Sequence, residues 1–383
     1  MLPIIVMRQR LRIFRRRSLR RWGTWSVSES RRSLQVAVVA NRKHSVRAPD
    51  DAPADALAEY DAEETVEGIQ RALSEAGHVV TCLEADASLP DSVRAARPDI
   101  CFNIAEGLRG DARESHVPAL LEMLGVPYTA SKVLTHAISL DKAMTKRIWR
   151  DYGLPTAPFQ CCDTADAPLD PALAYPLFVK PAREGSGMGI NADSIVHDEG
   201  ALHRQVGWVI TTYHQPALVE RYLPGREFTV GLVGNRRLPG REVHTGPVPG
   251  WYDDRGYHVF PVLEIDTGRG QVRGIYNAEA KGYAITSDEA PGYLCPADIP
   301  STLAARLHDL AVAAFEAIGG LDVSRVDFRL GDDGEPYLVE INTLPGVNPI
   351  VSDLVIAARA EGVAYETLIN EILNLALARY GIG

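Results

Sequence analysis

The feature that most limits the fold of this chain is a regular alternation of short apolar strands and amphipathic helices near its start. The run QVAVVA over residues 35–40 is β-branched and apolar throughout, which is typical of a buried parallel strand. The alternation continues through helices over 61–76 and 90–96 and strands over 78–83 and 99–104. Strand–helix–strand order predicts a parallel sheet with helical crossovers, so this segment is expected to form an α/β domain.

A further amphipathic helix is predicted over 115–124, and from about residue 132 the pattern changes to mixed helices and strands. Helices are then predicted over 140–152, 302–318, 351–361 and 364–380, and strands over 178–180, 218–221, 228–234, 325–330 and 336–341. The segment 235–300 is rich in glycine and proline and is predicted to be mostly loop. An Asp-Gly turn at Asp333-Gly334 joins the last two strands, which predicts a β-hairpin.

Charge divides the chain into two unequal parts. The 383 residues carry a formal net charge of −10, yet residues 1–33 contain ten arginines and one glutamate. That basic segment has little apolar surface to bury and is expected to be a disordered extension. The remainder is strongly acidic, which argues against a general nucleic-acid-binding protein.

Two classes of protein are disfavoured by the pattern of apolar residues and cysteines. No apolar run approaches the roughly 20 residues that span a bilayer, so no membrane span is expected. The five cysteines show no metal-ligand spacing, and reduced thiols in a cytoplasmic protein are the simplest interpretation.

The first motif with chemical content is a lysine followed by a glycine-rich loop. Lys180 ends a predicted strand, and Gly185, Gly187 and Gly189 follow it within nine residues. Glycines let backbone N–H groups approach phosphate oxygens, and the lysine adds positive charge. The pattern differs from a Walker A loop and, taken alone, also fits an ordinary structural turn.

The second motif spans the predicted hairpin. Alternation along a strand places Arg325 with Asp327 on one face, and Glu340 with Asn342 on one face of the partner strand. Two carboxylates and an amide oxygen are hard ligands that suit Mg²⁺ bound together with nucleotide phosphates. Arg325 can then contact a transferring phosphoryl group. The alternative is a solvated hairpin face with ordinary ion pairs.

The third motif is a strand that ends in a hinge and is followed by a second acid. Glu220 lies in the strand, Pro224-Gly225 forms the hinge, and Glu227 begins the next strand. A surface hairpin with exposed charges would give the same pattern.

In order and spacing, these motifs resemble the ATP-grasp superfamily, and specifically the D-alanine–D-alanine ligase family. The resemblance runs from about residue 35 to the C-terminus. It is strongest over 125–131, 140–142, 180–189, 220–227, 276–281 with 295–297, and 325–346. It implies an N-terminal parallel α/β domain followed by two α+β lobes that enclose ATP. The corresponding divisions are an extension over 1–33, the α/β domain over 34–131, a central lobe over 132–218 and a C-terminal lobe over 219–383.

The resemblance also implies a role for each matching residue. For ATP, the implied contacts are Lys142, Lys180 and Lys281 to phosphates, Glu184, Gly185 and Ser186 in a closing loop, Glu220 and Leu223 to adenine, and Glu227 to ribose. The implied metal ligands, for two Mg²⁺ or in their place Mn²⁺, are Asp327, Glu340 and Asn342. The implied catalytic groups are Arg325, Ser186, Lys281 and the backbone N–H of Gly346.

The function implied is an ATP-dependent carboxylate–amine ligase that joins amino acids through an acyl-phosphate. One alternative keeps this chemistry but uses a non-standard substrate, as in ligases that act on a mycosporine scaffold. Another is an inactive nucleotide-binding regulator, against which Arg325 argues, since a binder needs no group for an oxyanion. The family is often dimeric, so a homodimer also stays open.

Departures from the family pattern concern the substrate. The loop expected to hold the donor ammonium group, taken as residues 41–47, contains no acid, and Gly282 stands where the family often has tyrosine. Residues 103–114 also differ from the family's sequence. One hypothesis is that the donor is not a plain D-amino acid, and another is that Glu106 or Glu114 binds the substrate amine from another direction. The alternative is a shifted loop that keeps specificity for D-alanine. Ser352 or Asp353 is the candidate to bind the acceptor.

Overall fold

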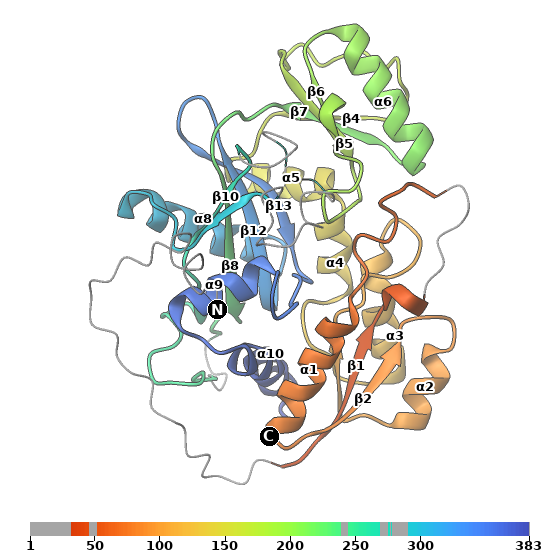
Figure 1. Cartoon of the computed structure of the whole chain (residues 1–383), viewed down its shortest axis with the longest axis vertical. Helices are drawn as coiled ribbons and strands as arrows, with labels where there is room; N and C mark the ends of the chain where they lie inside the picture. The colour runs from red at the N-terminus through yellow and green to blue at the C-terminus, as the bar shows by residue number, and fades with distance from the viewer. Residues whose placement is uncertain are drawn as a thin grey trace, which may run out of the picture. The chain divides into compact units, whose positions relative to one another are not determined.

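The computed structural model describes residues 32–45, 52–238, 244–268, 275, 277 and 290–382, and its N-terminal sheet is parallel as predicted. The strand order is β2 (Val79–Glu84), β1 (Gln35–Ala40), β3 (Ile100–Asn103), and both pairs are parallel. The helices α1 (Glu63–Glu75) and α2 (Leu89–Ala96) connect these strands (Figure 1). The short helices η2 (Lys43–Ser45) and η3 (Arg113–Ser115) and the helix α3 (His116–Leu124) complete this part.

A second sheet is antiparallel and lies under α6 (Glu199–Tyr213), as the upper lobe of Figure 1 shows. Its strand order is β4 (Phe159–Cys162), β7 (Ala217–Arg221), β5 (Leu177–Pro181), β6 (Ile195–Val196), with η4 (Ala192–Ser194) before β6. The sequence interpretation did not include α6, although Leu202, Val206 and Val209 have helical spacing and are buried against this sheet. The predicted boundary between the central and C-terminal lobes, at residue 218, falls inside strand β7.

The third sheet contains the predicted hairpin. It runs in the order β11 (Gly292–Leu294), β10 (Leu263–Asp266), β8 (Glu227–Gly234), β12 (Asp322–Leu330), β13 (Pro336–Asn342), with β9 (Tyr257–Val259) beside β8. Every pair is antiparallel, and α8 (Ser301–Ala317) packs against β8 and β12. The prediction of mostly loop over 235–300 missed β9, β10 and β11, which are too short to show a clear period.

The predicted helix over 140–152 is interrupted, so α4 (Val133–Leu140) and α5 (Lys142–Asp151) are separate helices. Asp141 ends one and caps the other, because its carboxylate accepts a 2.9 Å hydrogen bond from the Met144 N–H. This break places Lys142 at the first position of α5.

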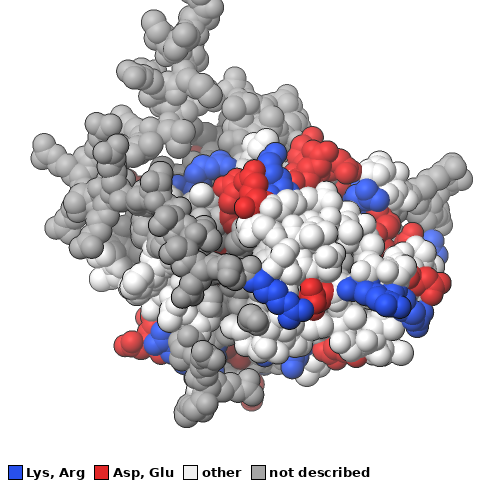
Figure 2. Space-filling model, turned by 90° about the horizontal axis from the view of Figure 1, so that it is seen from below, with Lys and Arg blue, Asp and Glu red and all other residues white. Residues whose placement is uncertain are grey.

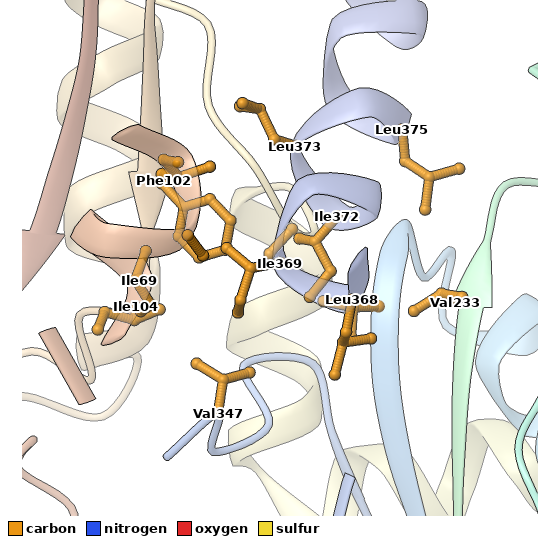
Figure 3. Packing of buried hydrophobic residues seen from close by; sticks show 14 of the residues in the cluster. Ile69, Phe102, Ile104, Val233, Val347, Leu368, Ile369, Ile372, Leu373 and Leu375 are labelled. Carbon is orange, nitrogen blue, oxygen red and sulfur yellow. The ribbon is translucent and has the colours of Figure 1, made fainter. Parts of the chain in front are cut away.

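One apolar core joins the first and last parts of the chain. Ile69 of α1 and Phe102 of β3 pack with Ile369 and Ile372 of α10 (Tyr365–Tyr380) (Figure 3). The same core includes Val347, just before α9 (Asp353–Glu361). These contacts position the loop after β13 against the N-terminal sheet.

On the face in Figure 2, basic and acidic side chains are interspersed around a broad area of other residues. Within the described ranges, no helix has the length and apolarity needed to cross a membrane. All five cysteines are free.

Candidate active site

A cavity of about 250 Å³ gathers most of the residues singled out from the sequence. It is lined by parts of the chain that lie far apart in sequence. Among its lining residues are Glu106, Glu114, Lys142, Gly185, Ser186, Arg325, Glu340, Asn342, Gly346, Ser352 and Asp353. Lys180, Glu184, Glu220, Leu223 and Glu227 do not line it, and Lys281 and Gly282 lie outside the described residues.

The hairpin face forms as the alternation predicts. Arg325 pairs in register with Asn342, and Asp327 with Glu340, so all four side chains lie on one face. Arg325 Nη2 lies 2.8 Å from Asp327 Oδ2, and the Thr229 hydroxyl donates a 2.6 Å hydrogen bond to Asp327 Oδ1. The side chains of Arg325 and Asp327 are only 12% and 19% exposed, so a solvated hairpin face is the wrong interpretation.

Asn342 links the other two members of this face. When the amide oxygen of Asn342 faces Arg325, that oxygen accepts a 2.8 Å hydrogen bond from Arg325 Nη2. The amide nitrogen then donates a 3.2 Å hydrogen bond to Glu340 Oε1. Two carboxylates and an amide, held on paired strands beside a cavity, fit the ligand chemistry of Mg²⁺.

Arg325 is held from a second side by the start of α9. Its Nη1 atom lies 3.3 Å from Asp353 Oδ2, so this aspartate positions the guanidinium group. Gly346 approaches Ser352 closely, and a Cβ atom at 346 would come within 3.0 Å of the serine Oγ. The absence of a side chain therefore keeps this backbone segment close to α9 at the cavity wall.

A buried ion-pair network lies outside the cavity. Glu220 accepts from Lys146 Nζ and Lys180 Nζ, each at 2.7 Å, and all three side chains are at most 7% exposed. Burial alone would raise the pKa of Glu220, but the two ammonium groups outweigh it and lower that pKa to about 2. Lys146 was missed in the sequence, although it lies one helical turn after Lys142.

The glycine-rich loop is attached to the segment before α1. The Gly185 N–H donates a 2.7 Å hydrogen bond to Glu59 Oε1, and a Cβ atom at 185 would come within 2.3 Å of that oxygen. Arg113 Nη2 donates to both Glu59 and Glu184 at 2.7 Å. The side chain of Glu184 is thus occupied by protein contacts, and its carbonyl accepts from Lys142 Nζ.

The conclusion that the loop after β1 lacks an acid is wrong. That connection extends to Ala62, and its second half contains Asp55, Glu59 and Asp61. The Gly189 N–H donates to Asp55 Oδ2 at 2.9 Å. Counting back from the start of α1, rather than forward from β1, would have found these residues.

Three carboxylates form what we call the acidic wall of the cavity: Asp61, Glu106 and Glu114. Among the described residues, neither Glu106 nor Glu114 has a hydrogen-bond or ion-pair partner, and Asp61 Oδ2 is buried without one. Burial, with repulsion from Glu114, raises the pKa of Glu106 well above its ordinary value. Burial likewise raises the pKa of Asp61 and of Glu114 to about 8.

The raised pKa of Glu114 predicts that Glu114→Gln stabilises the protein in the absence of substrate at alkaline pH. The folded state keeps a proton that the unfolded chain loses near the ordinary value of 4.5, so wild-type stability falls as pH rises from there to about 8. Urea unfolding at pH 8.5 should give the variant a free energy of unfolding higher by at least about 1 kcal/mol. The difference should vanish at pH 4. Equal stability at pH 8.5 would contradict this account of the carboxylate.

This chain is similar to known proteins over most of its length. The family model described as "D-ala D-ala ligase C-terminus" matches residues 148–374. An uncharacterised protein, y4sG, of Sinorhizobium fredii is 36% identical over 82% of this chain and 88% of its own length. The D-alanine–D-alanine ligase of Bordetella petrii is 33% identical over 82% and 86%, and that of Syntrophotalea carbinolica 34% over 82% and 91%.

A solved structure shows the same fold. The D-alanine–D-alanine ligase of Bacillus anthracis, complexed with ATP, superposes with a TM-score of 0.66 at 20% identity. The match covers 92% of this chain and 100% of that one. The three-sheet arrangement around the cavity is therefore a known architecture.

Proposed function

The chain belongs to the D-alanine–D-alanine ligase family of ATP-grasp proteins, and on that premise we propose that it forms a peptide bond between two amino acids through an acyl-phosphate. ATP would be converted to ADP and phosphate. The observation that carries the proposal is the hairpin face of Arg325, Asp327, Glu340 and Asn342 beside the cavity, with Gly346 on the same lining.

In the first step the donor carboxylate attacks the γ-phosphate, and the bond to ADP breaks. Lys142 at the cavity and Lys180 at the end of β5 would bind phosphate oxygens. Asp327, Glu340 and Asn342 would hold magnesium, two ions in our proposal, which supplies positive charge beside the transferring group. The loop of Gly185 and Ser186 would exclude water from the acyl-phosphate.

In the second step the acceptor amine attacks the acyl carbon and phosphate leaves. The tetrahedral intermediate carries a negative oxygen, and Arg325 with the backbone N–H of Gly346 would stabilise it. Ser352 would contact the acceptor, and Asp353 would act through its ion pair with Arg325. Lys281 would contact the phosphate oxygens of ATP.

The nucleotide would lie against the connection between β7 and β8. Glu220 and Leu223 would meet adenine through their backbone, since both side chains are buried. Glu227 would bind the ribose. All five thiols are free, which suits the cytoplasm.

Glu106 or Glu114 would bind a substrate ammonium group. Two further observations favour a second candidate, a ligase of the same chemistry that acts on a non-standard amino acid. One is the acidic wall. The other is that the Glu59 carboxylate already accepts hydrogen bonds from Arg113 and from the Gly185 N–H.

The experiment that tests the proposal is phosphate release from Mg-ATP with single and paired amino acids of both configurations. We expect release that depends on an amino acid, with a product mass equal to the two amino acids minus water. Release with D-alanine and a D-alanyl-D-alanine mass would support the first candidate. ATP binding without release for every pair of protein-type and D-amino acids would reject the first candidate.

A further inference from the structure

The lining of the cavity combines cationic and acidic side chains. Lys142 and Arg325 line it together with Gly346, and at these residues the transferring phosphoryl group and the carboxylate would be held. The acidic wall of Asp61, Glu106 and Glu114 lines the same cavity. A ligand that fills the space is therefore expected to carry both negative and positive groups.

Arg113 acts electrostatically on Glu106 and Glu114, and Lys142 acts on Glu114, but among the described residues no cation forms an ion pair with the acidic wall. Arg113 is used by Glu59 and Glu184, and Lys142 by the Glu184 carbonyl and by Glu340 at 3.6 Å. Lys43 is the cation whose charge acts on Asp61. Glu106 and Glu114 have no partner among the described residues, and the side chain of Glu114 is nine-tenths buried.

Keeping such groups charged without a partner is costly, and a ligand that brings positive charge to them offsets this cost. A structural purpose is hard to assign to carboxylates such as Glu106 and Glu114, which form no hydrogen bond or ion pair with the described residues. Among the described residues, no three Asp, Glu, His or Cys side chains are arranged to hold a metal ion. An ammonium group, with three donors and one positive charge, is the ligand that matches them.

One α-ammonium group is not enough for this wall. The acceptor amine must be uncharged when it attacks, so an ordinary donor amino acid brings a single positive charge, while the acidic wall has three carboxylates that form no ion pair with the described residues. We infer, on the basis of the proposed ligase function, that the substrate is a diamino carboxylic acid, whose second ammonium group binds at the acidic wall of Asp61, Glu106 and Glu114. The carboxylate of the same molecule then faces Arg325 and Lys142.

The test compares two substrates that differ only in the terminal amine. 2-Aminobutyrate and 2,4-diaminobutyrate have the same number of carbons, and each is supplied in both configurations with Mg-ATP. For the wild-type protein we expect phosphate release with kcat/KM about tenfold or more higher for 2,4-diaminobutyrate, the size of effect that one partly buried ion pair gives.

Variants of the acidic wall test whether the preference for 2,4-diaminobutyrate arises there. Glu114→Gln and Glu106→Gln should each reduce the ratio of the two kcat/KM values to about threefold or less, mainly through KM for 2,4-diaminobutyrate. The matched control is Glu67→Gln, on the exposed side of α1, which should leave the ratio unchanged. An unchanged ratio in both wall variants would overturn the assignment of the wall.

The outcomes separate the two proposals. Equal kcat/KM for both substrates would overturn the diamino-acid inference and leave the ligase function standing. Phosphate release with no amino acid at all would contradict the ligase function instead. In that case titration calorimetry with Mg-ADP present decides the inference. Tighter binding of 2,4-diaminobutyrate than of 2-aminobutyrate supports it, and equal affinity rejects it.

Discussion

Arg325→Met is expected to lower kcat for phosphate release by about 10²- to 10³-fold while leaving ATP affinity within a few-fold of wild type. The guanidinium group is the cation aimed at the proposed oxyanion, and removal of one such donor typically costs this much. Its two ion pairs, to Asp327 and Asp353, hold it rigidly on β12. Steady-state kinetics and a fluorescent nucleotide titration together measure both quantities.

The control is Arg255→Met, an arginine of similar length that pairs with Asp253 and Asp309 away from the cavity. It should keep wild-type kcat. If Arg325→Met kept kcat within threefold, the proposed role of this residue in the second step would be wrong.

The second large effect concerns stability. Glu220→Gln should lower the free energy of unfolding at pH 7 by about 3–5 kcal/mol, because Lys146 and Lys180 would remain buried without their shared carboxylate. Urea denaturation measures the loss. Glu75→Gln, an exposed acid at the end of α1, is the matched control and should change stability by less than about 0.5 kcal/mol.

The pH dependence of this effect has a definite sign. The pKa of Glu220 is lowered in the folded state, so its contribution is fully present above the ordinary value of 4.5 and is lost as pH falls toward 2. The difference between wild type and variant should therefore shrink across that window. A difference that stayed constant down to pH 2.5 would show that the lost stability has another origin.

Local patterns allowed much of the fold and part of the site to be predicted. The period-2 pattern placed Arg325, Asp327, Glu340 and Asn342 on shared strand faces, and the Asp-Gly turn joined the strands. Cross-strand pairing then brings the four together without any long-range information.

Contacts between distant segments could not be predicted in this way. Glu59 meets Gly185, and Lys146 meets Glu220, across sequence separations that carry no periodic signal. The connection from β1 to α1 was cut short at residue 47 because its proline- and alanine-rich stretch has no period. The acids beyond it were then left out of the substrate site.

The shared core of α1, β3 and α10 has a consequence for how the protein is made. The N-terminal sheet is synthesised first, yet residues such as Ile69 and Phe102 find their final apolar neighbours only in Ile369 and Ile372 near the end of the chain. A nascent chain on the ribosome therefore exposes this apolar surface until translation is almost complete. Chaperone binding during that interval would protect the growing chain from aggregation.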